Sequence, residues 1–238
     1  MTMIAALAIL SASCGSTAPP VNLRIDVDTE IDGRIQTSTA YWLMDVEDTF
    51  PQGASITIKG SALVIRITDS QRVYGLFRTF EGSEPSEFST IPAILNLFIR
   101  NEDEQLGREK IAPTSPSAFF HYAVDRLRGR KVPICQSSSN ARNLSSVCPA
   151  FIYFNEINDP NTAVTATVGQ RFTLSGHSIQ IKDVTATYDT GGSSPDLNKK
   201  LLPPFVKPKV DEMYADFPKN DSLRRNSQLR TIDFWRYQ

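Results

Sequence analysis

Alternating acidic residues near the start of the chain form its first candidate site. Asp28, Glu30 and Asp32 are spaced two residues apart and are followed by Gly33. Oxygen ligands at this spacing open a calcium-binding loop, in which they wrap a hard cation. The twelfth position counted from Asp28 is Thr39, where such a loop needs a bidentate carboxylate. We therefore interpret the run as the polar face of a strand and predict no metal site.

One of the two histidines lies close to other reactive side chains. His177 precedes Ser178, so a catalytic relay of His177, Ser178 and Asp183 can be drawn. No serine lies in a nucleophile-elbow sequence, and we therefore disfavour that relay. His177 joins the acidic run as a candidate polar site, and no catalytic residue is assigned.

Charge and composition argue against two further kinds of site. The formal net charge is -1, whereas a general nucleic-acid binder carries a basic excess that neutralises phosphates. The run Gly191–Ser194 lacks the Lys-Ser/Thr ending of a phosphate-binding loop, so we interpret it as a turn. Zinc and other transition metals need more histidine or free thiol than this chain offers. We predict no cofactor and no nucleic-acid partner.

The three cysteines divide into one near the N-terminus and two in the middle of the chain. Cys135 and Cys148 enclose a polar, serine-rich segment, and a pair of thiols with none left over suits an oxidising compartment. We predict a disulfide between them, which contributes about 3 kcal/mol in the chain-entropy model. The alternative is two unrelated buried thiols.

The first residues have the pattern of an export signal. Met3–Leu10 is an apolar run, too short for a membrane-spanning helix of about 20 residues but suited to a signal peptide. Small residues then precede Cys14, as in the lipobox of bacterial lipoproteins. We predict a signal peptide over 1–13, a lipid anchor on Cys14 and a tether over 14–21. The alternatives are a secretory signal that leaves Cys14 as a plain thiol and a buried N-terminal helix.

Period-two alternation in the first third of the chain predicts an antiparallel sheet. Two strands joined at Gly33 are expected over 22–46, with turns at Gly60-Ser61 and at 69–71. Further strands are expected over 55–59, 62–68, 73–80, 150–154, 163–168, 171–174 and 178–188. The alternation skips a residue between Ile181 and Val184, which predicts a β-bulge. An antiparallel meander is the simplest topology.

The middle third changes to helical spacing. Ser89–Pro92 offers a cap and an early proline. Apolar residues from Phe119 to Leu127, spaced three and four apart, then form one face of a helix. One or two helices are therefore predicted as an insertion near 89–131.

Prolines after Leu202 exclude long regular elements. Residues 203–238 are therefore predicted as an irregular C-terminal tail that packs on the domain through aromatic anchors such as Phe205. The predicted fold class is α+β and β-dominated, an antiparallel sheet or sandwich in one β-rich domain over 22–202.

Several short motifs along the chain carry a likeness to other proteins. They are Ile157–Pro160, Ile179–Thr185, Asn198–Pro203 and a closing segment Leu223–Phe234. Together they resemble an uncharacterised family of exported, often lipidated, proteobacterial proteins. Where the family pattern has Leu-Pro-Trp, this chain has Leu202-Pro203-Pro204. The resemblance implies export and a β-rich fold, and it implies no activity.

These features favour a non-enzymatic lipoprotein of the bacterial cell envelope, a binding or assembly module held at the periplasmic face of a membrane by Cys14. Gly15, rather than Asp, after the anchor favours the outer membrane. One alternative is an envelope hydrolase acting on glycan or lipid, which would use carboxylates of the acidic strand face or the turn at His177. The other is an accessory subunit that pairs with an envelope protein through a sheet edge or its tail.

Overall fold

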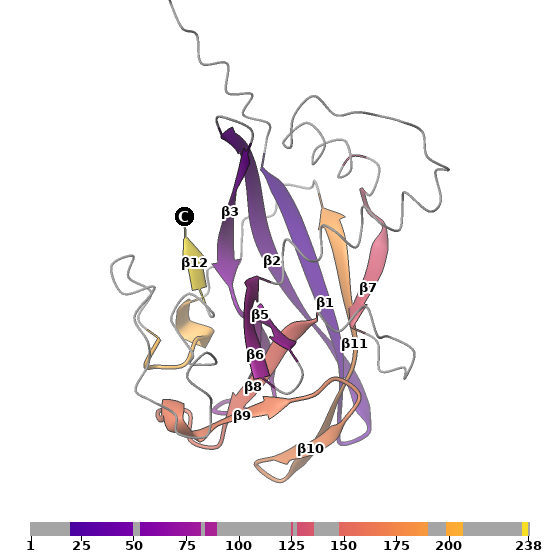
Figure 1. Ribbon diagram of the computed structural model, residues 1–238. Helices are drawn as coiled ribbons and strands as arrows, with labels where there is room; N and C mark the ends of the chain where they lie inside the picture. The colour runs from indigo at the N-terminus through magenta and orange to yellow at the C-terminus, as the bar shows by residue number, and fades with distance from the viewer. Residues whose placement is uncertain are drawn as a thin grey trace, which may run out of the picture.

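Antiparallel β-strands dominate the structure (Figure 1). The computed structural model describes residues 20–49, 53–81, 84–89, 125, 128–135, 148–189, 199–206 and 235–237. Over these ranges there are twelve strands and two short 3-10 helices. The prediction of a β-dominated, antiparallel fold is therefore confirmed.

The larger sheet has seven strands in the order β10-β11-β1-β2-β3-β12, with β7 also paired to β11. Its members are β1 Val21–Ile31, β2 Arg34–Thr49, β3 Gly53–Ser61, β7 Lys131–Cys135, β10 Arg171–Leu174, β11 His177–Asp189 and β12 Trp235–Tyr237. Because β1 occupies one edge of the long strand β11, β10 and β7 share the other edge.

The smaller sheet has five strands in the order β4-β5-β8-β9, with β6 also paired to β5. Its members are β4 Leu63–Arg66, β5 Arg72–Glu81, β6 Glu84–Ser89, β8 Pro149–Phe154 and β9 Ala163–Ala166. The 3-10 helix η1 (Pro160–Thr162) connects β8 to β9, and η2 (Lys199–Leu201) follows later in the chain.

The main core lies between the two sheets. Alternating residues of β1 and β2 pack in one apolar cluster with residues of β4, β5 and β8. At its centre the rings of Trp42 and Phe77 lie 4.6 Å apart, one from each sheet. Tyr153 of β8 also stacks on Phe172 of β10, with ring centroids 5.1 Å apart. The sheets are therefore joined by aromatic contacts as well as by aliphatic packing.

A second, smaller core covers the far face of the smaller sheet. Tyr74, Leu76 and Phe154 pack there with Leu202 and Val206. All six residues of β8 are consequently buried, because this strand has a core on each of its faces. Phe205 contacts Phe154 with ring centroids 5.1 Å apart, so its predicted role as an anchor of the tail is confirmed.

Most strands lie where the alternation places them. The predicted bulge is also present, since Asp28 pairs with Asp183 while Thr29 pairs with Ile181, which leaves Lys182 as the extra residue. The predicted turn at Gly60-Ser61 is wrong, because both residues continue β3 and pair with β12. A single meander is also wrong, since the chain passes from one sheet to the other after Ser61.

The predicted helical insertion near 89–131 is not supported. Residues 90–124 and 126–127 lie outside the described residues, while Ser89 ends β6 and Lys131 begins β7. The tail prediction is wrong for Trp235–Tyr237, which form β12 beside β3. Residues 207–234 lie outside the described part of the chain.

Candidate functional site

Two hairpin turns lie next to each other at one end of the larger sheet, because β1 and β11 are neighbours (Figure 1). One turn is Asp32-Gly33, with φ of 49° and 81°, and the other is Ser175-Gly176, with φ of 50° and 82°. Left-handed backbone at both central residues is the type I′ pattern that suits the twist of two-residue hairpins. The backbone N–H of Asp32 donates to the carbonyl of Ser178 at 2.9 Å, which joins the two hairpins.

Both oxygens of the Asp32 carboxylate are occupied by the neighbouring hairpin. Oδ2 lies 2.6 Å from Nδ1 of His177, and Oδ1 accepts the Ser178 backbone N–H at 2.9 Å. These two hydrogen bonds, the His177 bond first, lower the pKa of the Asp32 carboxyl. Because the side chains of Asp32 and His177 remain 51% and 38% exposed, solvent screens this pair.

The Glu30 carboxylate, also on β1, is held by two cations. Oε1 accepts from Arg171 Nη2 at 2.6 Å and Oε2 lies 2.9 Å from Lys182 Nζ. Hydrogen bonds from Lys182 and Arg171 lower the pKa of the Glu30 carboxyl. The bulge explains the contact with Lys182: the extra residue lets Ile181 and Val184 both reach the core while Lys182 stays on the outer face.

Asp28 lies apart from this group. It sits on the outer face of β1, where its Oδ1 accepts a hydrogen bond from Thr37 Oγ1 of β2 at 2.6 Å. The residue of β11 that pairs with Asp28 is Asp183, another acid. The predicted candidate set therefore divides, and we call Glu30, Asp32, Arg171, His177 and Lys182 the hairpin network.

The disfavoured relay of His177, Ser178 and Asp183 is not assembled. His177 contacts Asp32, from a hairpin 145 residues earlier in the chain. The Ser178 hydroxyl accepts from Arg171 Nη1 at 3.0 Å, and Asp183 lies opposite Asp28. The carboxylates of the hairpin network are bound by cations and N–H groups on an exposed face, an arrangement that fixes two turns together.

Among the described residues, no three His, Cys, Asp or Glu side chains gather closely enough to hold a metal ion. Asp28, Glu30 and Asp32 each have different partners: Thr37 for Asp28, Arg171 and Lys182 for Glu30, and His177 for Asp32. The residues of the partial calcium-loop likeness thus lie in a strand and in the hairpin turn that follows it.

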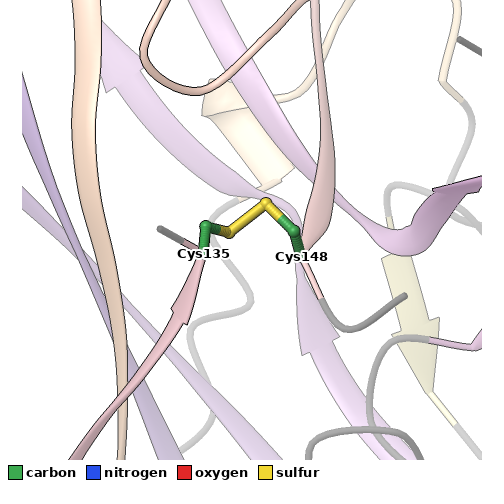
Figure 2. Close-up of a disulfide and its surroundings, with 2 residues drawn as sticks. All are labelled: Cys135 and Cys148. Atoms are coloured by element: carbon green, nitrogen blue, oxygen red, sulfur yellow. A yellow bond between two sulfur atoms is a disulfide. The ribbon is translucent and has the colours of Figure 1, made fainter. Parts of the chain in front are cut away.

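The predicted disulfide is present between Cys135 and Cys148, with Cα atoms 5.0 Å apart (Figure 2). Cys135 ends β7 in the larger sheet, and Cys148 directly precedes β8 in the smaller one. The bond therefore links the two sheets across the edge of the main core. Cys14, the predicted lipid anchor, lies outside the described residues.

The sequence did not point to Arg171 and Lys182 as partners of the acidic run. Arg171 is 141 residues from Glu30 along the chain, so no local pattern connects them. The one available signal was the bulge, which marks Lys182 as the residue leaving the regular alternation.

Acid should lower the free energy of unfolding of the wild type by more than that of the Glu30→Gln variant. The pKa of Glu30 is lowered from its ordinary 4.5 and that of Asp32 from 3.8. Each carboxylate therefore stabilises the fold fully above its ordinary value, and the contribution is lost as the pH falls toward the lowered value.

The measurement is the free energy of unfolding in urea at about pH 6 and about pH 3. Asp69→Asn, in the exposed turn between β4 and β5, is the matched control and should keep the wild-type difference. A Glu30→Gln protein that loses as much stability as the wild type between the two pH values would refute this role of the network.

Comparison of the chain with protein-family models, with curated proteins and with solved structures gives no match. In the part of the chain that the structure describes, no helix has the length and hydropathy needed to cross a bilayer.

Proposed function

We propose that this protein is a non-enzymatic lipoprotein of the bacterial cell envelope, a binding or assembly module tethered through Cys14. The observation that supports it best is the disulfide between Cys135 and Cys148, which links the two sheets. Such bonds persist in oxidising compartments and are rare in the cytosol. An exported, disulfide-linked domain is also what the signal-like residues 1–13 favour.

The state of the candidate carboxylates supports a binding module over a hydrolase. A glycosidase uses two carboxyl groups facing a substrate, one of them protonated near neutral pH. Glu30 and Asp32 instead each have a lowered pKa and bind groups of the neighbouring hairpin. Proton donation at neutral pH is unfavourable for carboxyl groups held in this way.

Two further parts of the proposal concern the location of the protein in the cell and the secondary structure of its middle third. The protein is held at the periplasmic face, with Gly15 after the anchor favouring the outer membrane. The insertion near 89–131 contributes one or two helices beside the β-rich domain. The envelope location fits the resemblance to exported, often lipidated, proteobacterial proteins, and the helices rest on the apolar spacing from Phe119 to Leu127.

Labelling with a radioactive fatty acid in a Gram-negative host tests the anchor. The wild-type chain should incorporate label and remain with membranes, because the lipid is attached at Cys14. Cys14→Ala should incorporate none, since the acceptor thiol is missing. The double variant Cys135→Ser/Cys148→Ser retains Cys14 and is the control that should still be labelled. Label on Cys14→Ala, or none on the wild type, would end the lipoprotein proposal.

A further inference from the structure

The outer edge of β3 is only partly covered. β2 pairs with one edge of β3 from Gly53 to Lys59. On the opposite edge β12 pairs with Lys59–Ser61, antiparallel to β3. Within the described ranges no strand pairs with the outer edge of Gly53–Ile58, which we call the open edge.

The sequence of the open edge lacks the features that keep edge strands from pairing. Its residues are Gly-Ala-Ser-Ile-Thr-Ile, with no charged residue and no proline. Native sheets protect their edges with lysine, proline, bulges or very short strands. Isoleucine and threonine favour extended backbone. This edge is therefore suited to accept another strand.

The register with β2 gives the open edge two different faces. Ile58 pairs with Met44, which is fully buried, and Ile56 holds the equivalent register position two residues earlier along β3. Thr57 pairs with Asp45 and Ser55 pairs with Glu47 on the outer face. Residues 45–58 contain three acids, Asp45, Glu47 and Asp48, and no lysine or arginine.

We propose that the open edge binds an extended peptide segment of a partner protein, antiparallel to β3, in which cationic side chains alternate with apolar ones. This rests on the proposed function as an assembly module and names the chemistry of its partner. Main-chain hydrogen bonds to the open edge would supply affinity, as in other cases of strand addition.

Two observations fix the direction and the alternation. β12 already adds to the same edge in the antiparallel sense, so a strand continuing along β3 extends an existing interface. A strand added there lies about 5 Å from β3 and about 10 Å from β2. In the register, Ser55 and Thr57 stand between the added strand and the acids Glu47 and Asp45, which favours cationic residues at alternate positions of that strand.

Backbone amide hydrogen exchange of the full chain tests the proposal. The probe is a blocked eight-residue peptide of alternating lysine and valine, and the control peptide replaces lysine by glutamate. With the lysine peptide, amides within Gly53–Ile58 should exchange at least about tenfold more slowly. The glutamate peptide should leave them unchanged, because its charge repels the acids of β2.

Thr57→Lys should raise the Kd for the lysine peptide at least about tenfold. The new cation faces Asp45, an opposite-charge pair that the sheet tolerates, while it charges the open edge. Thr37→Lys is the matched control: it also lies opposite an aspartate, Asp28, but at a position of β2 that pairs with β1 and lies outside the open edge. Ser55→Lys, opposite Glu47, replaces Thr57→Lys if that variant does not fold.

Several results would overturn the proposal. They are protection elsewhere than on β3, equal protection by both peptides, and equal binding by Thr57→Lys and the wild type. Protection of the edge that rises with protein concentration and needs no peptide would instead assign it to a second copy of this chain. Labelling of Cys14 is measured separately, so the strand-addition and lipoprotein proposals fail independently.

Discussion

Loss of the Cys135–Cys148 disulfide should lower the free energy of unfolding by about 3 kcal/mol. The bond closes a loop with a sequence separation of 13 residues, which restricts the unfolded chain. In the folded state it joins β7 of the larger sheet to the start of β8 in the smaller one. A domain of marginal stability, about 5–15 kcal/mol, would lose a large share of it.

Urea unfolding with and without a reductant measures this effect. Cys135→Ala/Cys148→Ala should match the reduced wild type and should not respond to the reductant. Cys14→Ala, which keeps the disulfide, is the control and should respond as the wild type does. If the oxidised and reduced wild type differed by less than about 0.5 kcal/mol, the chain-entropy account would fail here.

This result also bears on the compartment. A domain that needs its disulfide for a large part of its stability folds poorly where thiols are kept reduced. The fold would then require the oxidising conditions of the proposed envelope location. A reduced protein as stable as the oxidised one would remove the strongest support for export.

Local alternation explains how much of the fold could be predicted. The apolar positions of β1 and β11 fix which side chains face the core, so their bounds and the bulge at Lys182 followed from the sequence. β6, β7 and β12 were missed because each is short, and Pro85 and Pro133 interrupt the pattern of the first two. β7 and β12 depend on distant partners, β11 and β3.

The candidate site was also predicted only in part. The sequence grouped Asp32 and His177, and the structure brings them to 2.6 Å. It could not separate Asp28 from this pair, because the contact of Asp32 with His177 depends on β11 lying beside β1. Arg171 was missed because β10 lies two strands from β1, on the other side of β11. Contacts set by the order of strands in the sheet are invisible in a single sequence.

Gly60 has a structural role different from the turn that its sequence context indicates. Glycine followed by serine is a common turn signal, but Gly60 lies inside β3. A Cβ at this position would lie 2.8 Å from Trp42 Cδ1 and 3.3 Å from the Tyr41 carbonyl oxygen. The backbone of β3 therefore runs directly against the central tryptophan of the core, and that closeness requires glycine.

Gly60→Ala should consequently lower the free energy of unfolding by about 1–3 kcal/mol, the usual cost of overpacking a core. The indole of Trp42 has little room to yield, because it is fully buried, lies 4.6 Å from the Phe77 ring and donates from Nε1 to the Ser61 carbonyl at 2.9 Å. Urea unfolding followed by far-ultraviolet circular dichroism measures the loss.

Gly129→Ala is the matched control, since a Cβ there meets nothing within 4 Å and the backbone φ is +74°. That variant should lose only the cost of left-handed backbone, about 1 kcal/mol. A second change separates the steric explanation from a general weakening of the strand. In Trp42→Phe the smaller ring leaves space beside Gly60, so adding Gly60→Ala to it should cost less than adding it to the wild type.

The coupling energy of that double-mutant cycle should therefore be favourable by about 1 kcal/mol, as for residues in direct contact. Gly60 also pairs with Arg236 of β12, so a backbone pushed outward by the alanine should loosen this short strand. Faster amide exchange in Trp235–Tyr237 of Gly60→Ala, restored in the double variant, would follow. An additive cycle would instead mean that Trp42 does not require glycine at this position.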